Sequence, residues 1–254
     1  MTRRIVTAVG IGPGDAALLT PQAQRAIASA SVVVGYRPYL EQITPLTAGK
    51  TLIEGTMRRE AERCVLALES ALRGERVAVV SGGDAGIYGM AGLLLELTAA
   101  EKRFADIEVE VVPGITAALA CAALVGAPFA NDFAAVSLSD LLTPPERIRR
   151  RLRALAEADF AAALYNPASR RRHDMLDFAL AEFRRCGGGD LPCALVRDAY
   201  RPGQKIMIFP LDGFPTEEVN MTTLVVIGNS QTGTVNGKLF CRRGYREVSD
   251  GNKR

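Results

Sequence analysis

The fold is decided by residues 77–86, which read Val77-Ala78-Val79-Val80-Ser81-Gly82-Gly83-Asp84-Ala85-Gly86. Four apolar residues, three of them β-branched, form a short run without polar alternation, and a glycine-rich turn follows at once. Such a run is typical of a strand buried on both faces, as in a parallel sheet covered by helices. The stretch therefore indicates a strand of an α/β fold that ends in a turn able to approach a ligand.

The same alternation runs through the first half of the chain. A helix is expected from Thr20-Pro21, where threonine is the N-cap and proline occupies the first helical position. Another is expected over residues 57–72, with Gly74 placed to end it. We therefore predict an open, largely parallel sheet covered by helices. Its remaining elements are expected as strands at residues 5–9, 32–34 and 107–112 and a helix at residues 90–100.

The pattern changes beyond Ala130, where the last apolar runs lie too close together for helical crossovers. We expect antiparallel pairing there and a mixed sheet. The predicted strands are residues 134–138, 160–164, 194–196, 205–209 and 223–227, and the predicted helices are residues 145–156 and 170–185. With a boundary near residues 113–130, the chain is divided into an N-terminal α/β domain at 1–120 and a C-terminal α/β domain at 121–254, both of ordinary domain size.

Charge and composition exclude several classes of protein. The net charge of +3 is too small for a dedicated nucleic-acid binder, so no nucleic-acid partner is expected. The five cysteines contain no C-x-x-C pair, which argues against a disulfide framework or a zinc or iron–sulfur site and suits a reducing cytoplasm. His173 is the single histidine, so a Ser-His-Asp triad is open only if that residue is its base. No protein-bound metal is expected.

Residues 111–131 carry no charge and approach the length of a membrane span. However, Pro113-Gly114 and Gly126-Ala127-Pro128 leave room for a helix of only about 12 residues, which predicts a buried core helix. The apolar run at residues 5–11 is likewise interrupted by Gly12-Pro13 before a signal peptide could be completed. We expect neither a membrane span nor export.

The loop at residues 9–15 follows the first strand, where a doubly wound sheet places its ligand. It resembles the dinucleotide fingerprint G-x-G-x-x-G but fails it, because Asp15 stands where the third glycine belongs. Pro13 also removes a backbone N–H that a pyrophosphate would need. On its own, the segment is a weak signal, and a plain tight turn is the alternative.

Two more loops follow predicted strands and precede predicted helices. Residues 81–89 contain four glycines, and Asp84 among them could accept hydrogen bonds or face a cation such as a sulfonium. Alternatively, Asp84 is only the N-cap of the next helix. The small side chains of residues 112–118 would let an adenosyl group pack closely, although they could also serve helix packing alone.

Taken together, the three loops resemble, in order, the signatures of the tetrapyrrole methylase family. The resemblance continues at residues 131–133, 137–144, 164–169, 220–230 and 243–245 and so covers nearly the whole chain. Within the family, Gly83-Asp84-Ala85-Gly86-Ile87-Tyr88-Gly89 is similar to the branch that methylates precorrin-3B at C17, with ring contraction to precorrin-4, in cobalamin synthesis. The family implies a two-domain α/β architecture with a ligand cleft between the domains, a homodimer, a cytoplasmic location and S-adenosylmethionine as the methyl donor.

The resemblance also implies which positions contact the methyl donor. From the first domain these are Pro13, Gly83, Asp84, Ile87, Thr116 and Ala117. From the second domain they are Tyr165, Asn166, Asp198, Ala199 and Thr222, where the family varies more and where Tyr165 and Ala199 could instead be core residues. Methyl transfer from a sulfonium needs mainly alignment, which explains glycine loops in place of a catalytic triad.

Ring contraction requires a group that moves a proton to or from an oxygen of the macrocycle. The polar candidates on loops expected at the cleft are Asp84, Tyr88, Asp132 and Asp140, each of which could instead be a cap or turn former. The acidic side chains of a tetrapyrrole would pair with arginines, for which Arg37, Arg58 and Arg59 are the candidates. The arginine-rich helix at residues 145–156 is interpreted as a solvated face.

Three alternatives remain open. The chain could methylate a different ring position or protein side chain, or act on the cobalt-containing form of the same tetrapyrrole. It could also be a non-catalytic nucleotide- or RNA-binding module that uses the same glycine loops together with the arginines of residues 147–153. Titration with S-adenosylhomocysteine separates the last class from the others, because such a module should not bind it.

Overall fold

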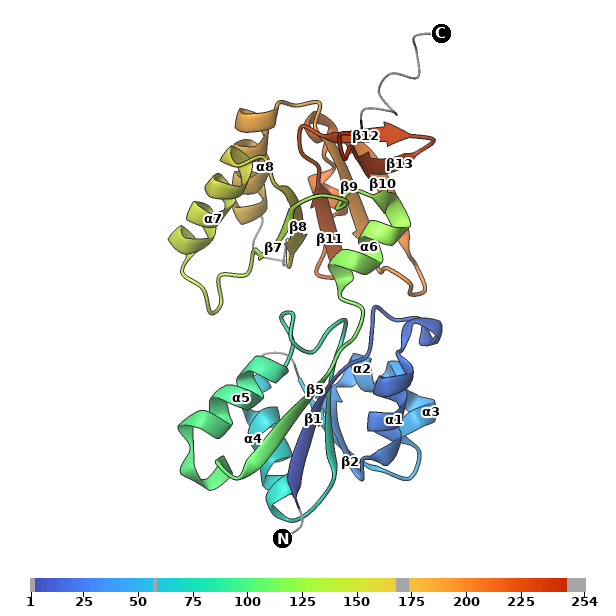
Figure 1. Ribbon diagram of the computed structural model, residues 1–254, viewed down its shortest axis with the longest axis vertical. Coiled ribbons are helices and arrows are strands. Elements are labelled where there is room, and N and C mark those ends of the chain that lie inside the picture. The colour runs from blue at the N-terminus through green and yellow to red at the C-terminus, as the bar shows by residue number, and fades with distance from the viewer. Residues whose placement is uncertain (1–2, 57–58, 168–173, 246–254) are drawn as a thin grey trace. The chain divides into compact units, whose positions relative to one another are not determined.

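The computed structural model describes residues 3–56, 59–167 and 174–245 (Figure 1). It divides into two compact units, Met1–Ala117 and Ala118–Arg254, close to the expected boundary at residue 120. None of the helices in the described part of the chain is long and apolar enough to span a membrane.

The first unit contains a five-stranded sheet in the order β3-β2-β4-β1-β5, and all of its pairings are parallel. The predicted parallel sheet is therefore confirmed. The edge strand β3 was not predicted, because its residues are largely exposed and lack a long apolar run. The strands are β1 (Arg4–Gly10), β2 (Val32–Tyr36), β3 (Thr51–Gly55), β4 (Val77–Ser81) and β5 (Ile107–Val112).

Helices cover both faces of this sheet (Figure 1). Along β4, Val77 and Val79 pack with helices α4 and α5, whereas Ala78 and Val80 pack against the opposite layer around α1. This alternation buries both faces, as the continuous apolar runs predicted. The helical segments are α1 (Pro21–Ser29), α2 (Arg37–Gln42), α3 (Thr44–Thr47), α4 (Glu60–Leu72), α5 (Ala91–Ala100), η1 (Ala16–Leu18) and η2 (Lys102–Phe104).

Two helix starts differ from the predictions. Helix α4 begins at Glu60 instead of residue 57, because Arg59 has the non-helical φ of −121°. Helix α5 begins at Ala91, one residue after the predicted start at residue 90, and ends at residue 100 as predicted. Thr20, by contrast, caps α1 as predicted, since its hydroxyl accepts a hydrogen bond from the Ala23 N–H.

The second unit contains a five-stranded mixed sheet in the order β10-β9-β11-β8-β7. Only β7 and β8 are parallel, so the predicted antiparallel pairing of the last strands is confirmed. A small three-stranded sheet, β12-β13-β6, was not predicted. The strands are β6 (Gly126–Ala127), β7 (Phe133–Ser137), β8 (Ala161–Tyr165), β9 (Pro192–Arg197), β10 (Lys205–Pro210), β11 (Thr223–Ile227), β12 (Thr232–Val235) and β13 (Lys238–Cys241).

One face of the mixed sheet packs on two helices through a core that includes Ile148, Leu152, Leu176 and Phe183. The predicted uncharged core helix is also present, and its alanines and Cys121 are largely buried. The helical segments of this part are α6 (Ala117–Val125), α7 (Pro145–Glu157), α8 (Asp174–Gly187), η3 (Leu211–Gly213) and η4 (Thr216–Glu218).

The five cysteines are free thiols, and only Cys186 is exposed. Burial raises the pKa of Cys64, Cys121 and Cys193 from the ordinary 9.0 to about 12. Since the thiolate is the reactive form, iodoacetamide at pH 8 should modify Cys186 in the folded protein and spare these three until denaturant is added. Mass mapping of the alkylated peptides checks this, and rapid labelling of Cys64 in the native protein would contradict it.

These buried thiols also predict the sign of a pH effect. The folded protein keeps their protons, whereas the unfolded chain loses them above a pKa of 9.0. The unfolded state then binds fewer protons, so stability falls as the pH rises. The thiol contribution is therefore fully present below about pH 9 and declines toward pH 12, which urea unfolding midpoints across that range would measure.

Candidate active site

Three loops meet beyond the carboxyl ends of the neighbouring strands β4, β1 and β5. The loop after β1 pairs with the loop after β4 through an isolated antiparallel bridge between Gly12 and Gly83. Each glycine donates its N–H to the carbonyl of the other, at 3.0 and 2.8 Å. The first two glycine loops are therefore joined by backbone hydrogen bonds, and the loop after β1 is more than a plain tight turn.

Glycines allow this close meeting of backbones. A side chain on Gly10 would place its Cβ 2.6 Å from the nitrogen of Gly114 and 2.8 Å from the carbonyl oxygen of Gly83. A Cβ on Gly114 would overlap the same Gly83 oxygen. Gly83 itself has a φ of +70°, a left-handed conformation that favours glycine. Each of the three loops thus contributes one glycine to a single point of contact.

Asp84 ties two of the loops together. One carboxylate oxygen accepts the Gly86 N–H at 2.8 Å, and the other accepts the Gly114 N–H at 2.9 Å. Asp84 is not the N-cap of the next helix, because α5 starts at Ala91. That end of the loop is held instead by Ser81, whose hydroxyl accepts the Met90 N–H at 3.1 Å. These contacts assign Asp84 a positioning role, and its proton-transfer role stays a prediction.

The other residues predicted at the methyl donor in this unit lie on the same loops. Pro13 follows Gly12, and Thr116 and Ala117 pass within 3.6 Å of where a Cβ on Gly83 would lie. Ile87 and Tyr88 are exposed at the tip of the loop after β4, and Tyr88 has a φ of 53°. The structure therefore brings the first-unit candidates to one end of one sheet. Asp15, which breaks the dinucleotide fingerprint, caps η1 by accepting the Ala17 N–H.

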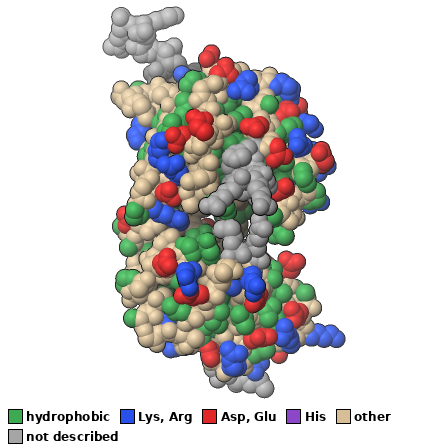
Figure 2. Space-filling model, turned by 180° about the vertical axis from the view of Figure 1, so that it is seen from behind, with side chains coloured by type: hydrophobic (Ala, Val, Ile, Leu, Met, Phe, Trp, Pro, Cys, Tyr) green, Lys and Arg blue, Asp and Glu red, His purple; other side chains and the backbone are tan. Residues whose placement is uncertain are grey.

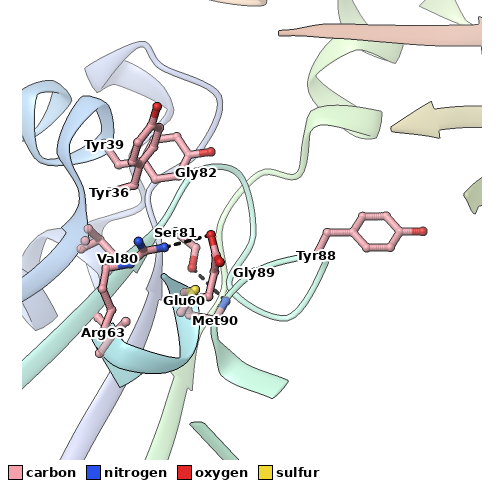
Figure 3. A pocket seen from close by; sticks show the side chains of 12 residues that line it. Tyr36, Tyr39, Glu60, Arg63, Val80, Ser81, Gly82, Tyr88, Gly89 and Met90 are labelled. Carbon is pink, nitrogen blue, oxygen red and sulfur yellow. Dashed lines mark hydrogen bonds and ion pairs between the residues drawn. The ribbon is translucent and has the colours of Figure 1, made fainter. Parts of the chain in front are cut away.

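A pocket of about 170 Å³ opens beside the loop after β4 (Figure 3). Its lining includes Tyr36, Tyr39, Glu60, Arg63, Ser81 and Met90. Arg63 is only 6% exposed, which is rare for an arginine, and its guanidinium contacts the Thr56 carbonyl and, at 3.3 Å, the Glu60 carboxylate. Sequence reasoning missed this residue. A signal existed, because Arg63 lies four and eight residues before the buried Ala67 and Ala71, on the core-facing side of α4.

The arginines predicted to bind substrate are placed differently. Arg37 and Arg59 are exposed, and they form ion pairs with Glu54 at 3.0 Å and Glu62 at 3.2 Å. Neither is among the residues that line the pocket beside β4. Arg58 and His173 lie outside the described residues. The role of these arginines toward substrate remains a prediction.

In the second unit, the residues predicted at the methyl donor lie at one end of the strands of the mixed sheet. Tyr165 ends β8 and Asp198 follows β9, while Thr222 precedes β11, which runs opposite to both. The Asp198 N–H donates to the Thr222 carbonyl at 3.3 Å, and the Asn166 amide donates to the Ser137 hydroxyl at 2.9 Å. Ala199 is next to Asp198 in this loop.

The backbone at this end of the sheet adopts unusual conformations. Asn166, Asp198 and Tyr200 have φ values of 51°, 49° and 57°, in the left-handed region that few residues other than glycine enter. Such residues cluster at ligand sites more often than elsewhere, because the surrounding structure must hold them there. This feature cannot be seen in the sequence, and it supports a ligand site at this end of the sheet.

Tyr165 has a structural contact that sequence reasoning missed. Its hydroxyl oxygen accepts the Ala118 N–H at 2.8 Å, in the first turn of α6. Tyr165→Phe would leave this part-buried N–H without its acceptor, so we expect a loss of about 1 kcal/mol of unfolding free energy. Urea unfolding measures this loss, and an unchanged midpoint at an unchanged slope would show that the contact adds nothing.

The structure does not bring Asp132 and Asp140 together. Asp132 immediately precedes β7 and Asp140 lies beyond its other end. A strand of this length spans roughly 16 Å. Strands β7 and β8 are parallel, so the residues that follow β7 lie at the same end of the sheet as Tyr165. Of the two aspartates, only Asp140 is at that end. The two aspartates therefore cannot serve one reacting group together, and Asp132 is the weaker candidate for proton transfer.

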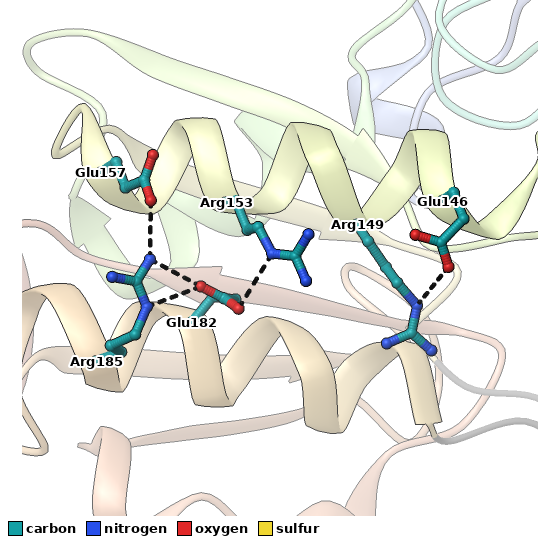
Figure 4. A network of polar contacts seen from close by, with 6 residues as sticks. All are labelled: Glu146, Arg149, Arg153, Glu157, Glu182 and Arg185. Atoms are coloured by element: carbon teal, nitrogen blue, oxygen red, sulfur yellow. Dashed lines mark hydrogen bonds and ion pairs between the residues drawn. The ribbon is translucent and has the colours of Figure 1, made fainter.

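Two arginines of the arginine-rich helix α7 form ion pairs (Figure 4). Arg153 contacts Glu182 at 3.5 Å, and Arg149 contacts Glu146 at 3.7 Å while lying over the ring of Phe178. Arg185 of α8 adds contacts to Glu157 and Glu182. Figure 2 shows basic and acidic side chains interspersed over the face in view. These contacts favour the solvated-face interpretation.

Among the described residues, no group of three or more His, Cys, Asp or Glu side chains is arranged to hold a metal ion. The loops already described thus offer backbone amides, one carboxylate and small side chains, which are suited to binding and aligning an organic molecule.

The first unit, a parallel sheet with glycine loops at the carboxyl ends of its strands, is of the doubly wound class, which binds small molecules at that end of the sheet. The family model of the Tetrapyrrole (Corrin/Porphyrin) Methylases matches residues 6–215. This chain belongs to that family, as its sequence motifs predicted. It is therefore an S-adenosylmethionine-dependent methyltransferase.

Known proteins resemble it over most of their length. A Salmonella typhimurium protein named "Probable cobalt-factor III C(17)-methyltransferase" is 42% identical over 95% of this chain and 99% of its own. The "Precorrin-3B C(17)-methyltransferase" of Sinorhizobium is 40% identical over 89% of each chain.

Solved structures agree with this family and with the predicted architecture. The crystal structure of the methyltransferase CobJ is 40% identical, has a TM-score of 0.89 and covers 93% of this chain and 99% of its own. The uroporphyrin-III C-methyltransferase of Thermus thermophilus, solved with S-adenosylhomocysteine, is 27% identical with a TM-score of 0.69, over 88% of this chain and 96% of its own.

Proposed function

We propose that this chain transfers a methyl group from S-adenosylmethionine to C17 of precorrin-3B in cobalamin synthesis, with ring contraction to precorrin-4. The observation that carries the proposal is the 42% identity to a named C17-methyltransferase across nearly the whole of both chains. The names of the two relatives differ in their substrates, precorrin-3B and cobalt-factor III, so the cobalt-containing tetrapyrrole is the second candidate substrate.

The loops of the first unit support methyl-donor binding. Gly10 and Gly114 let the three backbones pack closely, because a Cβ on either glycine would collide with backbone atoms of the neighbouring loops. The donor carries its own activation as a sulfonium, so the protein has mainly to align it. We propose Pro13, Gly83, Asp84, Ile87, Thr116 and Ala117 as first-unit contacts, and Tyr165, Asn166, Asp198, Ala199 and Thr222 as second-unit contacts.

The test uses methyl-labelled S-adenosylmethionine with each tetrapyrrole in turn. We expect label at C17 of one of the two, with a ring-contracted product. Label at another ring carbon would contradict the C17 assignment, and no transfer to either compound would contradict the substrate class. Binding of S-adenosylhomocysteine without any transfer would separate a wrong substrate from an inactive preparation.

We also propose a cytoplasmic homodimer. The five unpaired thiols suit a reducing compartment. In the first unit, β5 is an edge strand that exposes Val111, and α5 exposes Leu95, which gives an apolar area able to pair with another copy. Sedimentation equilibrium tests the dimer, and a monomer at micromolar concentration would contradict it.

A further inference from the structure

Arg63 is a buried charge with few compensating contacts. Its side chain is 7% exposed, whereas the side chain of its ion-pair partner Glu60 is 44% exposed. They meet through one atom pair at 3.3 Å, and the other contact within the described residues goes to the neutral carbonyl of Thr56. A buried cation is costly unless it is well paired, so a guanidinium in this state is typical of a group that binds an anion.

The backbone makes room for this arginine. A Cβ on Gly55, the last residue of β3, would lie 2.7 Å from Cγ and Nη1 of Arg63. The arginine stem therefore lies directly on glycine backbone, and the guanidinium reaches the pocket between β2 and β4 (Figure 3). Its position is set by Gly55 at the end of β3, by the Thr56 carbonyl that follows, and by the start of α4.

We propose that the pocket around Arg63 binds a carboxylate group of one of the enzyme's two substrates. The inference rests on the proposed function, which supplies molecules with such groups. A guanidinium presents parallel N–H donors that match a carboxylate, and the two contacts at Thr56 and Glu60 use only two of its five. The pocket measures about 170 Å³. Cavities of about 150 Å³ admit benzene, so a carboxylate-bearing arm fits.

Glu60 distinguishes the two possible sources of the carboxylate. The amino-acid end of the methyl donor carries an ammonium beside its carboxylate, and Glu60 next to Arg63 would attract that ammonium. An acidic arm of the tetrapyrrole carries no ammonium, so the Glu60 carboxylate would repel it. Glu60→Gln therefore weakens binding in the first case and leaves or strengthens it in the second.

The experiment compares Arg63→Gln, Glu60→Gln and the wild-type chain in two assays. Calorimetric titration uses S-adenosylhomocysteine and 5′-methylthioadenosine, which has the same nucleoside without the amino-acid group. Steady-state methyl transfer gives the KM of the tetrapyrrole. We expect Arg63→Gln to weaken one carboxylate ligand by roughly 10- to 100-fold and to leave 5′-methylthioadenosine unchanged.

The assays identify the source. Weaker S-adenosylhomocysteine binding in both variants assigns the donor's amino-acid group. A raised tetrapyrrole KM in Arg63→Gln, with donor binding kept and no loss in Glu60→Gln, assigns an acidic arm of the substrate. Changes below about 2-fold for both ligands would overturn the proposal, because exposed pairs alone produce effects of that size. An equal loss for both adenosyl ligands would also overturn it, since that indicates distortion.

Two further variants serve as controls for a general loss of structure. Arg73→Gln removes an exposed arginine just beyond the same helix and outside this pocket, and should change neither assay. If Arg63→Gln fails to fold, Arg63→Lys keeps the charge and much of the stem, and it should weaken the same ligand by roughly 3- to 10-fold. Wild-type affinity of Arg63→Lys for both ligands would overturn the proposal. The titrations need no turnover, so they remain informative if the C17 assignment fails.

Discussion

Gly114→Ala is expected to slow methyl transfer by about 100-fold, the size of effect that a displacement of about 1 Å can have on aligned reactants. The added methyl group would overlap the carbonyl oxygen of Gly83 and lie 2.7 Å from the carbonyl carbon of Gly10. Both obstacles are backbone atoms next to strands in the centre of the sheet, so neither can turn aside as a side chain could. The loops must move apart, which displaces the surface we propose for the methyl donor.

Single-turnover label transfer measures this loss, and calorimetry gives the affinity for S-adenosylhomocysteine. Overpacking should also lower the unfolding free energy by about 1–3 kcal/mol. Gly92→Ala is the matched control, because a Cβ on that glycine of α5 meets nothing within 4 Å. It should stabilise the helix by about 0.4–1 kcal/mol and leave transfer intact. Normal transfer by Gly114→Ala would show that the three loops are not packed as described.

Asp84→Ala is expected to weaken S-adenosylhomocysteine binding by roughly 10- to 100-fold. The substitution leaves the N–H groups of Gly86 and Gly114 without their acceptors and releases the loop after β4 from the loop after β5. Each N–H left without an acceptor lowers the stability of the loop by about 1–3 kcal/mol when it is buried, and by less when water can reach it. Asp106→Ala, an exposed aspartate of the same unit, is the control and should have no effect.

Asp84→Asn separates positioning from proton transfer. The amide would point its own N–H groups at one of the two backbone donors, so a positioning role predicts nearly the same loss of binding as in Asp84→Ala. If Asp84 transfers a proton instead, Asp84→Asn should bind S-adenosylhomocysteine normally and fail only in turnover. Titration and product analysis of the same preparation distinguish the two outcomes.

Much of the fold could be predicted because its central strands are buried on both faces. Val32–Tyr36 and Val77–Ser81 appear in the sequence as short apolar runs, and their spacing requires helical crossovers. The edge strand Thr51–Gly55 and the short helices α2 and α3 lack such a signal, because they are short and contain few buried residues. The local pattern is therefore informative where burial is complete and is too weak in the largely exposed strand Thr51–Gly55.

The sequence predicted which loops form the site, but it did not predict which of their residues are in contact. The three loops could be picked out by their glycines, whereas the meeting of Gly10, Gly83 and Gly114 depends on strand order, which sequence spacing does not reveal. Arg63 was missed for a different reason. A charged residue on an amphipathic helix is ordinarily assigned to solvent, and only its position on the apolar side of α4 argues otherwise.

The strand order has a consequence for how the chain assembles. Strand β1 pairs only with β4 and β5, which lie about 70 and 100 residues later in the chain, and never with the strand made next after it. During synthesis it stays unpaired until β4 has left the ribosome, and its other edge stays open until β5 follows. The first strand made therefore completes the centre of the sheet last, and chaperone dependence should be greatest while residues 1–112 are emerging.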